Sequence, residues 1–134
     1  MNNNTLSFVA ATIVASSLLG LAWVNVSNNS ALAQGATTGT TISMAKGSQS
    51  ASNPEFFVPA EATAKAGETV TWKNDDTAIH TATSGQDATP DGKFDTSLVP
   101  PGQSSKPIAM PNAPGQYPYF CSLHPWMEGT ITVS

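Results

Sequence analysis

Three segments of the chain alternate apolar and polar residues with a period of two, the pattern of a β-strand with one buried face. They are residues 68–74 (ETVTWKN), 115–121 (GQYPYFC) and 129–134 (GTITVS). The residues expected to face inward are Val70, Trp72, Tyr117, Tyr119, Cys121, Ile131 and Val133. A chain with such strands must cover their apolar faces with a second layer, so the pattern favours a β-sheet packed against another sheet.

Turn-forming residues separate these segments and point to the same class. The chain has 10 glycines and 10 prolines, and a turn is expected at residues 100–103 (PPGQ). Residues 78–83 (AIHTAT) are predicted as a further strand carrying His80, and residues 84–92 (SGQDATPDG) as a loop. Several short strands with frequent turns predict an all-β domain of the β-sandwich type.

The N-terminal part has a different composition. Residues 6–24 form an uncharged run of apolar and small residues, close to the length of about 20 that a membrane-spanning helix needs. Ala31, Leu32 and Ala33 then provide a small-x-small pattern suited to signal cleavage. We expect residues 1–33 to be a signal peptide or an uncleaved membrane anchor, 34–39 a flexible linker, and 40–134 the folded domain. Either reading predicts an extracytoplasmic protein, periplasmic or on the cell surface.

The charge of the chain excludes one class of partner. Five lysines, no arginine and nine acidic residues give a net charge of −4. A nucleic-acid-binding protein requires a basic face, and this chain cannot assemble one. We therefore expect no nucleic-acid partner, and contact with a membrane only through an uncleaved N-terminal anchor.

The single cysteine begins the segment CSLHPWM, in which Cys121, His124 and Met127 follow one another at intervals of three. A lone cysteine is often a small buried apolar residue, but this spacing joins a thiol, an imidazole and a thioether in one short loop. A thiolate, two imidazoles and a weak thioether form a blue-copper site. His80 is the only other histidine in the chain and would supply the second imidazole. Zinc sites prefer four cysteine or histidine ligands, or keep a position for water, and neither arrangement accounts for Met127.

Residues 54–134 resemble a cupredoxin of the plastocyanin and amicyanin kind. The resemblance rests on GETVTWKNDD, the following His80, KFDTSLVPPG, GQYPYFC and CSLHPWMEGTITV, which stand in the order of that family. It implies a Greek-key β-sandwich, the cupredoxin fold, with one type 1 copper ion as cofactor. It also implies that His80, Cys121 and His124 are the equatorial ligands and that Met127 is the axial one.

The resemblance further implies an electron carrier rather than an enzyme. Both histidines are used by one copper site, so the chain has none left for a second copper centre or a catalytic set. We expect a small exported monomer that shuttles single electrons between redox partner proteins by Cu(II)/Cu(I) cycling. The partners are expected to dock near Leu123, His124, Pro125 and Trp126. Extracytoplasmic copper storage or delivery would use the same ligands and remains the alternative.

Overall fold

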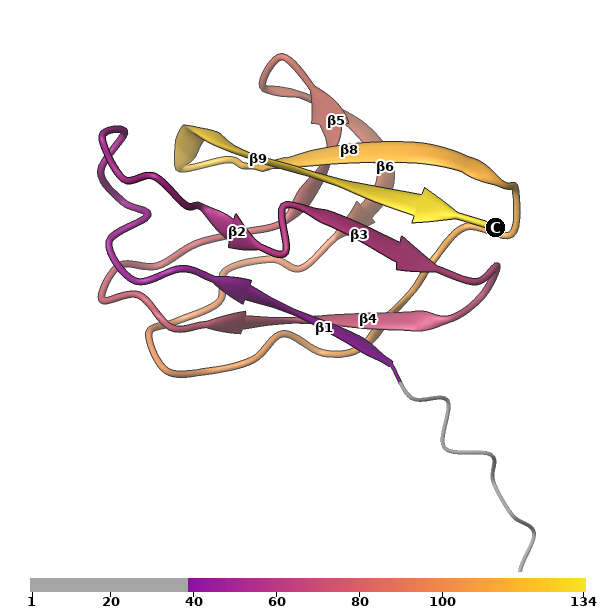
Figure 1. The fold of residues 1–134 in the computed structure, drawn as a ribbon, viewed down its shortest axis with the longest axis horizontal. Helices are drawn as coiled ribbons and strands as arrows, with labels where there is room; N and C mark the ends of the chain where they lie inside the picture. Colours follow the sequence, from indigo (N-terminus) through magenta and orange to yellow (C-terminus); the bar gives the residue numbers. More distant parts are fainter. Residues whose placement is uncertain (1–38) are drawn as a thin grey trace, which may run out of the picture. The chain divides into compact units, whose positions relative to one another are not determined.

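The computed structural model describes residues 39–134, which form nine β-strands (Figure 1). The strands are β1 (Thr40–Met44), β2 (Phe57–Val58), β3 (Glu61–Ala64), β4 (Thr69–Asn74), β5 (Thr83–Gln86), β6 (Thr89–Asp95), β7 (Ile108–Ala109), β8 (Gly115–Cys121) and β9 (His124–Val133). The predicted signal or anchor segment and linker lie outside the described residues. No helix within residues 39–134 has the length and apolar character needed to cross a bilayer.

The strands form two mixed sheets. One has the order β2-β1-β4-β7 and the other the order β3-β9-β8-β5-β6. The pairs β1–β4 and β3–β9 are parallel, whereas the remaining pairs are antiparallel. Parallel neighbours need a connection that crosses to another part of the fold, and the chain crosses between the sheets several times. Only the consecutive pairs β1–β2, β5–β6 and β8–β9 stay within one sheet. The predicted all-β sandwich is confirmed.

The core lies between the two sheets and is rich in aromatic residues. Trp72 of β4 stacks on Phe94, with ring centroids 5.6 Å apart, and meets the ring of Tyr119 edge-on. The Phe57 ring also meets the Tyr119 ring edge-on, with centroids 4.7 Å apart. Gly129 stands opposite Tyr119 in the β8–β9 pair, where a Cβ atom would lie 2.5 Å from the tyrosine ring. A glycine is therefore required for the ring to lie against the neighbouring strand.

The alternating segments at residues 68–74, 115–121 and 129–134 are strands as predicted, with their apolar members buried. The predictions for residues 78–92 were wrong. His80 lies outside the regular strands and makes only an isolated bridge to Val99. Residues 84–92, expected to be a loop, belong largely to the β5–β6 hairpin.

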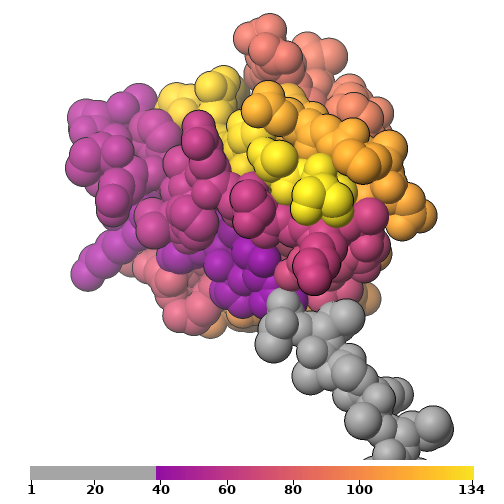
Figure 2. Space-filling model, turned by 45° about the vertical axis from the view of Figure 1, so that its right-hand side comes forward, coloured from indigo at the N-terminus to yellow at the C-terminus, as the bar shows by residue number. Residues whose placement is uncertain are grey.

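That hairpin turns at Asp87 and Ala88, whose φ angles are 51° and 56°. Two successive residues with positive φ form the type I′ turn that suits the twist of paired strands. The usual signal for this turn is Asn-Gly or Asp-Gly, and Asp-Ala does not provide it. The turn projects from the edge of the five-stranded sheet (Figures 1 and 2).

Three connections between strands lie together at one end of the sandwich. The loop between β1 and β2, the segment after β4 and the β8–β9 turn all lie at the end opposite the C-terminus, on the left in Figure 1.

Candidate metal centre

His80 is held by backbone pairing rather than by membership of a sheet. Its N–H donates to the carbonyl oxygen of Val99 at 3.3 Å, and the Val99 N–H donates back at 2.8 Å. The buried Asn74 amide fixes both sides of this segment, because its Nδ2 donates to the carbonyl oxygens of Ala78 and Val99 at 2.7 and 2.8 Å. The His80 side chain is fully buried.

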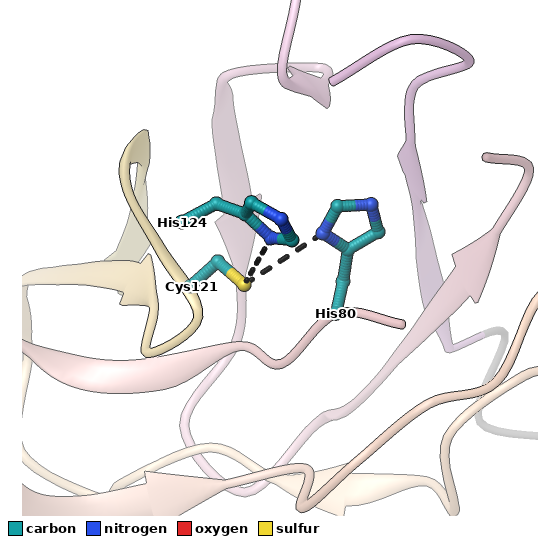
Figure 3. A group of neighbouring side chains, drawn as sticks. All are labelled: His80, Cys121 and His124. Carbon is teal, nitrogen blue, oxygen red and sulfur yellow. Dashed lines mark hydrogen bonds between the residues drawn. The ribbon is translucent and has the colours of Figure 1, made fainter. Parts of the chain in front are cut away.

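Cys121 and His124 lie at the two sides of the tight turn between β8 and β9. Cys121 is the last residue of β8 and pairs with His124, the first residue of β9, after a register shift at residues 120 and 121. The antiparallel pairing therefore places the thiol and the imidazole side by side, although they are three residues apart in the chain. Figure 3 shows both imidazole rings directed toward the sulfur.

The three donor groups converge. Cys121 Sγ lies 3.7 Å from His80 Nδ1 and 3.6 Å from His124 Nδ1, and one donor atom from each residue lies within 4.8 Å of the others. The two imidazole centroids are 4.7 Å apart. Cys121 is fully buried and His124 is partly exposed. Met127 is also fully buried, in the same core cluster as Cys121.

The surroundings of the thiol favour its ionised form. Burial acts to raise the pKa of Cys121, but its contacts with the His80 and His124 rings and the hydrogen bond donated by the Thr81 N–H lower that pKa to about 6. The Thr81 N–H donates to Cys121 Sγ at 3.3 Å. The thiolate is the form of cysteine that binds metal. The metal-free chain therefore already favours the metal-binding form of Cys121.

A buried acid behind His80 was missed by the sequence analysis. Asp76 Oδ2 lies 2.8 Å from His80 Nε2, and Ser48 Oγ contacts the same ring nitrogen at 3.4 Å. Burial acts to raise the pKa of Asp76, but hydrogen bonds from the backbone of Gly47, from His80 and from other donors hold it well below its ordinary value. The signal available in the sequence is the interval of four residues between Asp76 and His80. This interval predicts a contact between the two side chains only if the segment between them is recognised as a turn.

The donor set distinguishes between metals. A thiolate and two imidazoles with a nearby thioether match the ligands of blue-copper sites, where soft sulfur and imidazole together serve both copper oxidation states. A structural zinc site would need a fourth cysteine or histidine, and the chain contains one cysteine and two histidines in all. The cofactor that fits this arrangement is a single type 1 copper ion.

Comparisons with known proteins identify the family of the chain. A family model described as a cupredoxin-like domain matches residues 16–133. A plastocyanin from Scenedesmus fuscus is 39% identical over 85 residues, which cover 58% of this chain and 85% of the plastocyanin.

Solved structures share the fold. A purple cupredoxin from Nitrosopumilus maritimus superposes with a TM-score of 0.65 at 29% identity, covering 71% of this chain and 99% of that protein. A reduced Cu(I) form of amicyanin superposes with a TM-score of 0.55 at 22% identity, covering 72% and 82% of the two chains. The chain belongs to the cupredoxin-like family.

Proposed function

We propose that this protein is a small exported electron carrier whose copper ion is bound by His80, Cys121, His124 and Met127. The convergence of the first three donor groups at one end of the sandwich carries the proposal. When bound, a type 1 copper ion supplies a one-electron Cu(II)/Cu(I) couple. We assign no catalytic reaction to the chain, because copper binding uses its single cysteine and both of its histidines.

The chain's contribution is to hold its ligands in place before any ion arrives. His80 is fixed by two backbone hydrogen bonds to Val99, and Cys121 and His124 by the β8–β9 pairing. The Thr81 N–H donates to the Cys121 sulfur and joins the two ligand segments. Ligands held in this way need to move little when a bound copper ion gains or loses an electron. Small rearrangement of the ligands is what fast electron transfer requires.

We propose that redox partners dock where His124 approaches the surface. Leu123 and Trp126, on either side of it in the chain, are 51% and 39% exposed. The Trp126 ring lies edge-on to the His124 ring, with centroids 5.3 Å apart, and its Nε1 donates to the Ser48 carbonyl oxygen. Exposed apolar side chains of this size support a protein-docking surface, and Pro125 is exposed beside them.

We also propose that the protein is exported across a membrane and that it retains its copper ion. The apolar run at residues 6–24 supports export across a membrane. Copper storage or delivery would use the same ligands but would require the ion to leave readily. Full burial of Cys121, His80 and Met127 supports retention instead.

The proposal is tested with the copper-loaded protein and one surface variant. We expect a reversible one-electron couple with one copper per chain, and slow loss of Cu(I) to a competing chelator. Leu123→Ala should slow electron exchange with a redox partner while leaving the visible spectrum unchanged. Val58→Ala is the matched control, because Val58 is similarly exposed at 40% but lies on β2. Rapid transfer of Cu(I) to an acceptor without reversible cycling would favour copper delivery and refute the carrier.

A further inference from the structure

The Asp76 carboxylate is enclosed by hydrogen-bond donors. Its side chain is 1% exposed. Oδ1 accepts from the N–H groups of Gly47 (2.8 Å) and Thr77 (2.7 Å), and Oδ2 from the Gln49 N–H (3.0 Å), Ser48 Oγ (3.3 Å) and His80 Nε2 (2.8 Å). The Asp76 N–H is itself held by Asn74 Oδ1 at 2.9 Å. The carboxylate is thus fixed in position and can act only as an acceptor.

This environment determines which nitrogen of the His80 ring carries the proton. A neutral imidazole has one donor and one acceptor nitrogen, and the hydrogen bond made by one of them selects the form of the other. Nε2 lies 2.8 Å from Asp76 Oδ2, a full hydrogen-bond contact with an oxygen that accepts from every other neighbour, whereas Nδ1 is 3.7 Å from Cys121 Sγ, so the geometry places the proton on Nε2. Nδ1, which faces the Cys121 sulfur at 3.7 Å, then keeps its lone pair free for a metal ion.

We propose that Asp76 is a positioning residue for the copper site, which fixes His80 in the Nε2–H form and presents Nδ1 to the ion. This inference rests on the proposed function only in naming copper as the ion. A carboxylate behind a ligand imidazole fixes the ring orientation and increases the basicity of the coordinating nitrogen. The extra negative charge favours Cu(II) over Cu(I), so Asp76 also lowers the reduction potential.

A purely structural role for Asp76 would have different consequences. Its hydrogen bonds to Gly47 and Gln49 also hold the β1–β2 loop. In Asp76→Asn the amide oxygen can keep the place of Oδ1, whereas the NH2 group replaces Oδ2 and meets the Nε2–H of His80 donor to donor. The ring relieves this conflict by moving its proton to Nδ1, and a metal ion must then displace that proton before it can bind there.

The first measurement needs no variant and no copper. Two-bond proton–nitrogen correlations of the histidine rings are recorded on the ¹⁵N-labelled, metal-free full chain at alkaline pH, where the His80 ring is neutral. We expect His80 to be protonated at Nε2 in the wild type. A proton on Nδ1 would overturn the proposal. This result is independent of the electron-carrier function, which fails separately if the copper-loaded wild type shows no reversible couple.

The second measurement compares Asp76→Asn with Asp75→Asn. Asp75 is the matched control because it is the neighbouring residue and carries the same charge, but it is exposed and bonds Ser43 and Lys73. Asp76→Asn should place the His80 proton on Nδ1 and weaken Cu(II) binding by about 10–100-fold. Each tenfold loss of Cu(II) relative to Cu(I) raises the reduction potential by about 59 mV.

Asp75→Asn should keep the wild-type tautomer and a potential close to that of the wild type. The proposal is overturned if Asp76→Asn folds with the wild-type tautomer and behaves like Asp75→Asn. If Asp76→Asn does not fold, the ring measurement on the wild type still decides.

Discussion

The Thr81 hydroxyl connects the two chain segments that carry the copper ligands, and its removal should measurably weaken the fold. Thr81 is 5% exposed, and its Oγ1 accepts from the Ser122 N–H at 2.9 Å. It also lies 3.1 Å from Thr83 Oγ1, whose own proton goes to Asp95 Oδ2. Thr81 therefore donates to Thr83 while it accepts from the residue that follows Cys121.

Thr81→Val replaces this hydroxyl by a methyl group of similar size. The Ser122 N–H then loses its acceptor in a partly buried position, which costs about 0.5–1.5 kcal/mol of unfolding free energy. With a urea dependence of about 2 kcal/mol per molar, a loss of about 1 kcal/mol lowers the urea midpoint by about 0.5 M.

The assay is equilibrium urea unfolding of the metal-free protein, followed by tryptophan fluorescence. Thr132→Val on β9 is the control, because Thr132 is exposed and a surface change of this kind stays within about 0.5 kcal/mol. The slope of the transition should be the same in both variants. A Thr81→Val protein as stable as Thr132→Val would refute the role of the hydroxyl as a connection between the ligand segments.

Three further predictions follow from the site and its supports. In the metal-free protein, thiolate absorbance of Cys121 should appear with a midpoint near pH 6, because hydrogen bonds lower the pKa despite burial; Cys121→Ser gives the baseline, and a midpoint near the ordinary thiol value would contradict the prediction. Gly129→Ala should lower the unfolding free energy by about 1–3 kcal/mol, since its Cβ overlaps the buried Tyr119 ring; thermal unfolding measures this, and an unchanged midpoint would show that the ring moves freely. Trp126→Ala should slow electron exchange and leave the visible copper absorption nearly unchanged, whereas loss of colour would mean that Trp126 builds the site.

The sequence was most informative where one side of a strand is buried. The alternation in β4, β8 and β9 is visible because the sandwich core accepts only the apolar residues of each strand. The short interval between Cys121 and His124 is equally local, since a tight turn between paired strands brings them together. His80 could be chosen by counting, because the chain has only two histidines.

The remaining features depend on contacts between distant segments. His80 is held by Val99 and Asn74, not by its own neighbours, so its segment resembles a strand in sequence without belonging to one. The support from Ser48 and Asp76 arises because the β1–β2 loop folds over the site. Neither residue carries a local signal, since acids and serines in loops are usually solvated.

The central claim is that four side chains bind one copper ion at the end of the sandwich where β8 turns into β9. A crystal structure of the copper-loaded protein, with anomalous diffraction recorded at the copper absorption edge, tests it most directly. We predict one anomalous peak within bonding distance of His80 Nδ1, Cys121 Sγ and His124 Nδ1, with the Met127 sulfur as a more distant ligand. A peak elsewhere, or a Cys121 sulfur turned away from the ion, would contradict the account.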